Sequence, residues 1–154
     1  MRIAVLGAGS WGTTVASLLA GRHDCIIWSR DPELAREIYE RDANSRYLPG
    51  FALPPGLQAT ADLEKATHDA DLLVVGVPTH GFRAILADAR PYLRPWIPVV
   101  SLSKGFERGS LLRMTQLIAA ELPGHDLLSQ VGPGQGGGGM AGKFGGDQLG
   151  HAQQ

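Results

Sequence analysis

The chain has 154 residues, of which 44% are hydrophobic and 19% are charged, and its formal net charge is −1. This balance leaves no basic surplus for nucleic acid or an anionic membrane, and no apolar run reaches the roughly 18 residues that span a bilayer. Length and composition predict one soluble globular domain. The single cysteine, Cys25, excludes an intramolecular disulfide and fits a reducing cytoplasm, and its apolar neighbours predict a buried thiol.

The first twelve residues combine a strand, a glycine turn and the start of a helix. An aliphatic run over residues 2–6 leads into Gly7-Ala8-Gly9-Ser10-Trp11-Gly12, after which apolar residues recur at helical spacing. This G-x-G-x-x-G pattern, between a strand and a helix, indicates a dinucleotide-binding turn. Gly7 allows the tight turn, Gly9 lets the backbone approach a pyrophosphate, and Gly12 lets the helix lie close to the strand. Because the pattern begins almost at the initiator methionine, we expect no signal or transit peptide before it.

Strand and helix signals then alternate, which is typical of an α/β protein with a mostly parallel sheet and helices on both faces. The expected strands cover residues 24–29, 57–60, 72–77, 99–102 and 127–131. Helices are expected from Pro32, over residues 79–89 and over residues 110–121, and Asp62 is expected to cap a brief helix. Residues 44–56 are expected to be irregular. Asp31 is the expected cap of the helix at Pro32, and Leu34, Ile38 and Tyr39 give that helix an apolar stripe.

The chain changes character near its C-terminus. Ten of the 21 glycines fall within residues 132–154, four of them in the run 136–139. Such a segment buries too little apolar surface to offset chain entropy. We therefore predict a dinucleotide-binding Rossmann domain over residues 1–133 and a disordered tail over 134–154. A second phosphate loop in the glycine run is the alternative, but no strand and helix frame it.

The end of the second expected strand bears on which dinucleotide binds. In NAD-binding folds an acidic residue about 20 positions beyond the glycines takes the ribose hydroxyls. Here the first acid is Asp31, which suits a helix cap better. Arg30 is placed to accept a 2′-phosphate through a charge-assisted contact, with Ser29 adding a hydroxyl. The position favours NADP over NAD, and a solvated surface arginine is the alternative for Arg30.

Four segments, taken in order, resemble one known family. They are Gly7 to Gly12, Asn44-Ser45-Arg46-Tyr47-Leu48-Pro49-Gly50 with Leu53-Pro54, Val77-Pro78-Thr79 with Phe82-Arg83, and Ser101-Leu102-Ser103-Lys104-Gly105-Phe106-Glu107. With them, residues 1 to about 133 resemble the bacterial NAD(P)-dependent glycerol-3-phosphate dehydrogenases. The resemblance implies an N-terminal Rossmann fold followed by an all-helical substrate domain.

The resemblance also implies which residues bind ligands. The implied cofactor-binding residues are Gly7, Gly9, Ser10, Trp11, Gly12, Arg30, Tyr47 and Lys104. It places Lys104 where cofactor and glycerol phosphate meet, and it makes Gly132 a second substrate-binding residue. A lysine just past the C-terminal end of a strand stands where ligands of open α/β sheets bind, and its ammonium suits negative charge that develops during hydride transfer. On spacing alone, an exposed loop lysine is an equal alternative.

Other candidates carry less weight. Pro78 ends its strand beside the expected nicotinamide, and His80 follows as a lone histidine. Arg83 has two interpretations, a contact with the family's irregular loop or a structural ion pair. The histidines show no metal-ligand spacing, so no metal site is expected.

The chain departs from the family after Pro133. Gly134-Gln135-Gly136 replaces the family's continuation after Gly-Pro, and the family's second lysine, the usual proton acceptor, has no counterpart because Lys143 comes far too early. This predicts a fragment or a shifted reading frame, with no catalytic residue in this chain and no activity of the chain alone.

For the complete enzyme, the resemblance implies interconversion of dihydroxyacetone phosphate and sn-glycerol 3-phosphate with NAD(P)H in the cytoplasm, for glycerophospholipid precursors. A homodimer is one form open to the full-length protein. Two alternatives stay open: an inactive NADP(H)-binding module, and the Rossmann half of another NADP-dependent reductase, such as one acting on ketopantoate.

Overall fold

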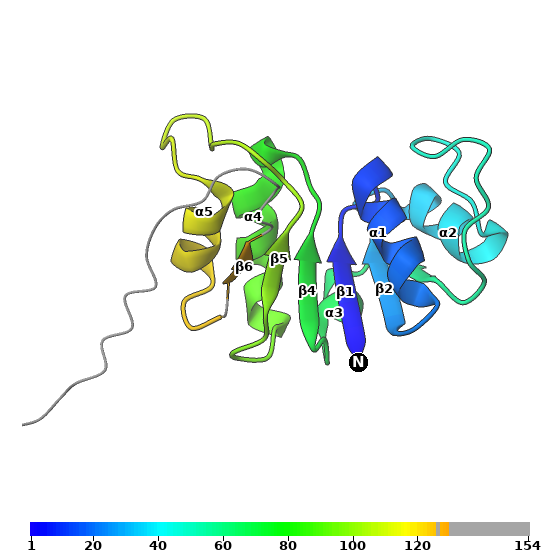
Figure 1. The fold of residues 1–154 in the computed structure, drawn as a ribbon, viewed down its shortest axis with the longest axis horizontal. Helices are drawn as coiled ribbons and strands as arrows, with labels where there is room; N and C mark the ends of the chain where they lie inside the picture. The colour runs from blue at the N-terminus through cyan, green and yellow to red at the C-terminus, as the bar shows by residue number, and fades with distance from the viewer. Residues whose placement is uncertain (126, 130–154) are drawn as a thin grey trace, which may run out of the picture.

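A computed structural model describes residues 1–125 and 127–129. In this part of the chain, parallel strands form one sheet with the order β3-β2-β1-β4-β5-β6 (Figure 1). The strands are β1 (Arg2–Leu6), β2 (Asp24–Trp28), β3 (Gln58–Thr60), β4 (Leu72–Val75), β5 (Val99–Ser101) and β6 (Leu127–Ser129). Strands β2 and β3 are added on one side of β1, and β4, β5 and β6 are added on its other side. The order in which strands are added therefore reverses between β1 and β4, although all strands run parallel. This is the doubly wound, Rossmann-type order that the sequence predicts.

Helices connect the strands and cover both faces of the sheet. They are α1 (Ser10–Ala20), α2 (Pro32–Arg41), α3 (Leu63–Thr67), α4 (Thr79–Ala89), the short 3-10 helix η1 (Arg90–Tyr92) and α5 (Met114–Glu121). Among the described residues, none of these helices has the length and apolar character needed to cross a membrane.

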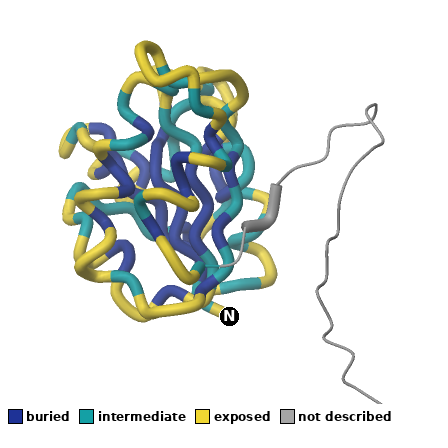
Figure 2. Tube along the Cα trace, turned by 90° about the vertical axis from the view of Figure 1, so that its left-hand side faces the viewer, coloured by how far each residue is buried: buried dark blue, intermediate teal, exposed yellow. Residues whose placement is uncertain are grey.

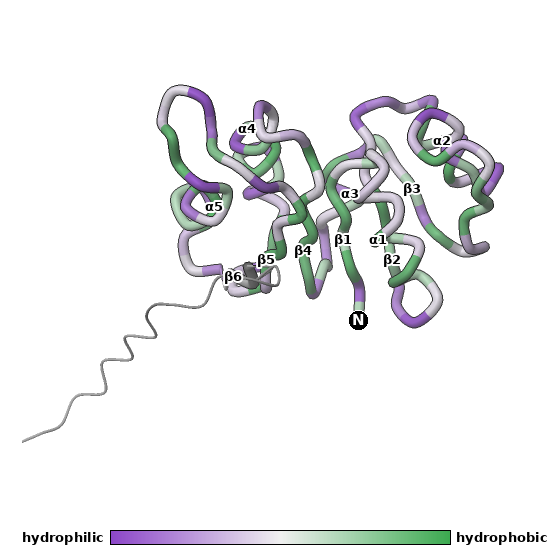
Figure 3. The backbone as a smooth tube through the Cα atoms, turned by 45° about the horizontal axis from the view of Figure 1, so that its top comes forward, coloured by the Kyte–Doolittle hydropathy of each residue, from purple (hydrophilic) through white to green (hydrophobic). Residues whose placement is uncertain are grey.

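Helices cover both faces of the sheet, and successive side chains of a strand point to opposite faces. One strand therefore contributes to a core on each face. On β1, Ala4 and Leu6 pack in a core with α3, α4 and α5, whereas Ile3 and Val5 pack in a second core with α1 and α2. Figure 2 shows buried segments gathered inside the molecule, and Figure 3 shows β1, β2 and β4 as largely hydrophobic segments. Cys25 lies in the second core, where burial raises the pKa of its thiol to about 12, in agreement with the predicted buried thiol.

Two aspartates begin helices as the sequence predicts. A carboxylate oxygen of Asp31 accepts hydrogen bonds from the backbone N–H of Glu33 at 2.9 Å and of Leu34 at 3.5 Å at the start of α2. Asp62 accepts one from the backbone N–H of Lys65 at 3.0 Å at the start of α3. By contrast, no side chain caps α1. Helix α4, which follows Pro78, also begins without a side-chain cap, so the first backbone N–H groups of α1 and α4 have no side-chain partner.

The predicted elements have the right type and order. Some of their bounds differ, and so does the set of residues on the buried face of α2. Strands β2, β4 and β5 end one or two residues earlier than expected, because the chain leaves the sheet there to form loops. Helix α5 begins at Met114 and not at residue 110, because residues 106–113 form a turn closed by a bridge between Phe106 and Arg113. Tyr39, predicted on the apolar stripe of α2, is 64% exposed, and the buried residues of this helix are Leu34, Ala35 and Ile38. Residues 130 and 131 of the last expected strand, and the predicted tail, lie outside the described residues.

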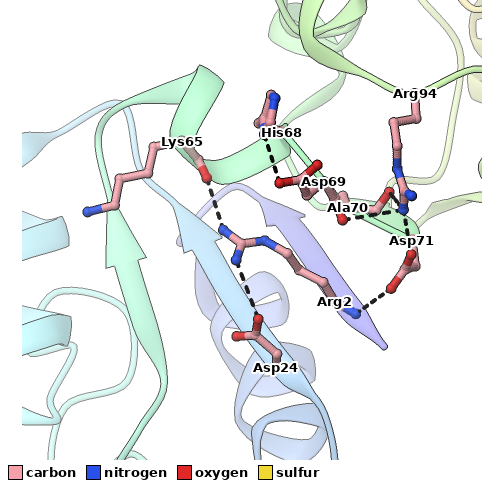
Figure 4. Close-up of polar contacts among 8 residues, drawn as sticks. All are labelled: Arg2, Asp24, Lys65, His68, Asp69, Ala70, Asp71 and Arg94. Atoms are coloured by element: carbon pink, nitrogen blue, oxygen red, sulfur yellow. Dashed lines mark hydrogen bonds and ion pairs between the residues drawn. The ribbon is translucent and has the colours of Figure 1, made fainter.

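Polar groups hold the amino ends of the strands together (Figure 4). The backbone N–H of Arg2 donates to Asp71 at 2.7 Å, and the Arg2 guanidinium donates to Asp24 at 3.4 Å and to the carbonyl of Lys65 at 3.3 Å. Arg94 forms an ion pair with the same Asp71 carboxylate. The N–H of Arg2, and after it Arg94, lower the pKa of Asp71. Asp71 therefore joins the start of β1 to the segment that leads into β5.

Candidate functional site

A cleft of about 670 Å³ lies at the opposite edge of the sheet, beyond the carboxyl ends of the strands. Residues that follow β1, β2, β4 and β5 line it, together with part of the irregular loop after α2. The cleft therefore spans the point between β1 and β4 where the order of strand addition reverses. In open α/β sheets this crevice is where ligands bind.

Three glycines bring β1, β4 and α1 close together at the floor of the cleft. Gly7 has a φ of +110°, and a Cβ there would lie 2.8 Å from the carbonyl oxygen of Gly76. A Cβ on Gly12 would lie 1.8 Å from the carbonyl oxygen of Gly7, and one on Gly76 would lie 3.4 Å from the Cα of Gly12. Gly7 and Gly12 thus serve turn and close packing as predicted, and Gly76 is a third member that the sequence motif does not include.

Gly9 differs from these three because it faces open space. A Cβ on Gly9 would have no atom within 4 Å, and its backbone is extended with a φ of −71°. It is also the residue before the first turn of α1, where no side chain occupies the free N–H groups. A helix N-terminus of this kind favours a phosphate through its free donors and its dipole. The space above Gly9 thus fits a pyrophosphate that approaches the backbone.

A buried asparagine joins the irregular loop after α2 to the glycine turn. The Asn44 side-chain amide donates to the carbonyl of Ala8 at 3.0 Å and to the Thr13 hydroxyl at 2.8 Å, and its oxygen accepts from the backbone N–H of Tyr47 at 3.0 Å. The Ser10 hydroxyl donates to the carbonyl of Tyr47 at 2.9 Å. These contacts bring Tyr47 to the cleft beside the start of α1. The sequence motif contains Asn44, but only its burial reveals what it does.

Two arginines and an aspartate form the end of the cleft next to β2. Arg30 is exposed and lines the cleft beside the buried Ser29. Arg46, from the irregular loop, pairs with Asp31 at 2.7 Å. The N–H of Glu33, and after it Arg46, lower the pKa of Asp31, and the hydrogen bond to Asp31 raises the pKa of Arg46. Asp31 therefore stays ionised and already has partners. Arg46 is a further cation of the cleft, which its sequence position does not indicate.

The far end of the cleft is formed where β4 and β5 end. Pro78, Thr79 and His80 begin α4 and face the cleft, and Lys104 faces it from the loop after β5. The Ser103 hydroxyl donates to the carbonyl of Val77 and so ties the two loops together. Lys104 is exposed. Its ammonium stands at the carboxyl edge of the sheet, as the sequence analysis expects.

Arg83 does not line the cleft, and its contacts decide between its two interpretations. Its guanidinium makes two hydrogen bonds of 2.8 Å to the Glu107 carboxylate and a further ion pair to Glu121. Arg83 is therefore a structural ion-pair residue. Within residues 1–125 and 127–129, no group of histidine, cysteine, aspartate or glutamate side chains could hold a metal ion.

The structure gathers most of the expected ligand residues in one place. The residues that line the cleft include Gly7, Gly9, Ser10, Trp11, Arg30, Tyr47 and Lys104. Gly12 is buried behind the glycine turn, and Gly132 lies outside the described residues. The cleft thus offers an open backbone turn at an uncapped helix start, cations at the β2 end, and a lysine at the β5 end. An elongated anionic ligand with two phosphates, such as a dinucleotide, fits this distribution of charge and space.

Comparisons with known proteins agree with this chemistry. A family profile described as the N-terminus of NAD-dependent glycerol-3-phosphate dehydrogenase matches residues 2–135. The chain is 46% identical over 133 residues to glycerol-3-phosphate dehydrogenase (NAD(P)+) 2 of Sphingopyxis alaskensis, covering 86% of this chain and 40% of that protein. It is 48% identical over 133 residues to the Mycobacterium avium glycerol-3-phosphate dehydrogenase (NAD(P)+), covering 86% and 39%.

A solved structure gives the same result. The glycerol-3-phosphate dehydrogenase of Coxiella burnetii superimposes with a TM-score of 0.76 at 29% identity, over 83% of this chain and 39% of that one. The chain thus spans about 40% of the length of the curated relatives that it matches.

Proposed function

The chain belongs to the NAD-dependent glycerol-3-phosphate dehydrogenase family through the N-terminal domain of that family, and from this we propose that its cleft binds NADP(H) or NAD(H). One observation carries the proposal: Gly9 leaves open space directly at the uncapped start of α1. The free N–H groups there favour a pyrophosphate, and the cleft beside them extends from Arg30 at one end to Lys104 at the other.

Within this proposal the β2 end of the cleft binds the adenosine half. Asp31 is occupied as the cap of α2 and as the partner of Arg46, so it is poorly placed to accept hydrogen bonds from ribose hydroxyls. Arg30 is exposed beside the Ser29 hydroxyl, and its guanidinium can form a bidentate contact with a 2′-phosphate. These features support NADP as the preferred dinucleotide.

The β4 and β5 end then takes the nicotinamide and the substrate. A bound nicotinamide cofactor supplies or accepts a hydride. Pro78, His80 and Lys104 line this end of the cleft. Pro78 and His80 would border a bound nicotinamide ring, and Lys104 would donate a hydrogen bond to cofactor and substrate. Its positive charge stabilises negative charge on the substrate oxygen. Gly132 is proposed as a second substrate contact.

For the complete enzyme we propose the interconversion of dihydroxyacetone phosphate and sn-glycerol 3-phosphate, as a cytoplasmic step that supplies glycerophospholipid precursors. The full-length protein is proposed to assemble as a homodimer. Because the chain spans about 40% of its curated relatives, a second candidate function is a binding module that holds NADP(H) without turnover. For the 154-residue chain alone we propose this binding module. Hydride transfer needs the substrate held in near-attack geometry with water excluded, and we assign that task to the part of the relatives that this chain does not span.

One two-step experiment tests both statements. NADPH is titrated into the purified chain and its fluorescence is followed, with Gly9→Val as the matched control that fills the proposed pyrophosphate space. We expect saturable binding by the original chain and weak binding by the control. Dihydroxyacetone phosphate is then added and NADPH absorbance is followed.

The outcomes separate the candidates. Absence of binding would overturn the proposed function. Binding without a decrease in absorbance supports the binding module, and turnover of dihydroxyacetone phosphate would show that this chain alone is an enzyme. Turnover of ketopantoate in a parallel sample would instead assign the domain to another reductase.

A further inference from the structure

The short span that carries Lys104 is held at both of its ends by the same part of the fold. On one side, the Ser103 hydroxyl donates to the carbonyl of Val77, just after β4. On the other side, Glu107 is bound by Arg83 on α4. Between these points lie Lys104, Gly105 and Phe106. Both attachments therefore fix the Lys104 span relative to the β4–α4 connection, which forms the far wall of the cleft.

The attachment at Glu107 is a bidentate one. The Arg83 Nε and Nη2 atoms donate to the two Glu107 carboxylate oxygens at 2.8 Å each. This parallel geometry fixes direction as well as distance, which a single hydrogen bond does not. The Glu107 backbone also closes its own loop, because its N–H donates to the carbonyl of Leu112 at 2.8 Å and its carbonyl accepts from the N–H of Leu111 at 3.0 Å. Glu107 thus links α4 to the whole turn over residues 106–113.

In the described part of the chain, this attachment depends on the positive charge of Arg83. The guanidinium binds Glu107 and Glu121, and the two carboxylates are each about one-fifth exposed. Removal of the Arg83 charge leaves two carboxylates that repel each other across the gap between the 106–113 turn and α5. The turn, and the lysine at its start, would then move away from the cleft wall.

We propose that Arg83 and Glu107 are positioning residues that hold Lys104 against the cofactor. The inference rests on the proposed function, because it assumes that Lys104 contacts the dinucleotide. Neither Arg83 nor Glu107 lines the cleft, so an effect on the ligand passes either through the Lys104 span or through the start of α4, and the second test below separates these two routes.

The first test needs no cofactor. Trypsin cleaves after lysine and arginine, and the exposed residues Lys104 and Arg108 lie within and just beyond the held span. We expect Arg83→Gln and Glu107→Gln to increase the cleavage rate after Lys104 and Arg108, as identified by fragment masses. Glu121→Gln keeps the bidentate pair and serves as one control.

Arg94→Gln serves as the second control, because it removes an ion-paired arginine from the opposite edge of the sheet. Both controls are expected to retain the original cleavage pattern. Equal cleavage in all variants, or equal acceleration in Arg94→Gln, would overturn the proposal that the pair holds this span.

The second test asks whether the pair acts through Lys104. NADPH affinity is measured for the original chain, Arg83→Gln, Lys104→Ala and the double variant. We expect Arg83→Gln to weaken binding about five-fold in the original background and to have almost no effect once Lys104 is gone. A purely structural role predicts the same loss in both backgrounds, and that result would overturn the inference.

Failure of the two proposals can be distinguished. No NADPH binding by the original chain contradicts the proposed function, while the trypsin comparison still decides whether Arg83 and Glu107 hold the span. Normal binding by Lys104→Ala contradicts the further inference and the proposed contact between Lys104 and the cofactor, because the lysine would then contribute nothing that Arg83 could position, but it leaves the proposal that the cleft binds a dinucleotide intact.

Discussion

The two edges of the sheet use polar residues in opposite ways. At the amino edge, Arg2, Asp71 and Arg94 bind one another and neighbouring backbone groups (Figure 4). At the carboxyl edge, Arg30 and Lys104 are exposed on the walls of a cleft, and the start of α1 has no side-chain cap. The same strands end in both places. Polar contacts at the amino edge thus stabilise the fold, whereas the carboxyl edge keeps donors available for a ligand.

Two glycines at the carboxyl edge should respond very differently to substitution by alanine. Gly12→Ala places a Cβ 1.8 Å from the Gly7 carbonyl oxygen, so we expect a loss of about 3 kcal/mol or more in the free energy of unfolding. Gly9→Ala meets no atom within 4 Å and should keep its stability while weakening NADPH about ten-fold. Thermal unfolding and NADPH titration of both variants measure this split. Equal loss of stability in both would remove the distinction between packing and ligand glycines.

A second pair of variants compares one arginine from each edge. Arg30→Ala should weaken NADPH about ten-fold while leaving NADH and the melting temperature nearly unchanged, because the lost contact is with the 2′-phosphate. Arg94→Gln should do the reverse, with a small fall in melting temperature and unchanged affinity for both dinucleotides. Fluorescence titration with each dinucleotide is the measurement. Equal weakening of NADPH and NADH by Arg30→Ala would contradict the 2′-phosphate assignment.

The third prediction uses pH to compare carboxylates from the two edges. Arg83, and after it Ser110, lower the pKa of Glu107 from its usual 4.5 to about 2. A depressed folded-state pKa contributes stability that is present above pH 4.5 and is lost as the pH falls through about 2. Glu107→Gln should therefore flatten the acid side of the melting-temperature profile.

Asp71→Asn should flatten the same limb, since the pKa of Asp71 is also lowered. Only Glu107→Gln should weaken NADPH at neutral pH. An unchanged acid limb in Glu107→Gln would show that the Arg83 pair does not persist in solution.

The smallest effect is expected from the end of the chain. Deletion of residues 134–154 removes the glycine-rich segment, which we predict to add nothing to either edge. The melting temperature should shift by less than about 2 °C, and NADPH affinity should stay the same. Differential scanning calorimetry is the measurement, and a clear fall would show that the segment packs on the domain.

Local signals explain why much of the fold is predictable from sequence. The caps at Asp31 and Asp62 depend on backbone groups two or three residues away, and the expected elements begin there. Most strands are short apolar runs between turn residues, a pattern that the sequence alone makes visible. The start of α5 is not predictable in this way, because the turn before it depends on a bridge between Phe106 and Arg113 and on a distant arginine on α4.

The same distinction holds for the candidate site. Gly7, Gly9 and Gly12 have a fixed spacing that sets their tasks before the structure is known. Arg46 and Gly76 belong to the cleft only because folding brings β2, β4 and the irregular loop together, and nothing in their own neighbourhood marks that contact. The resemblance to a family supplied Tyr47 and Lys104, which spacing alone left open.

The contacts among Gly7, Gly12 and Gly76 restrict which substitutions this domain can accept during evolution. The atoms that a new Cβ would strike at Gly7 and Gly12 are chiefly backbone carbonyl atoms, which every amino acid carries. A second-site substitution that shrinks a neighbouring side chain therefore cannot suppress a replacement at either position. Genetic selections for revertants should return the original glycine, whereas replacements in the two cores leave room for compensation by neighbours.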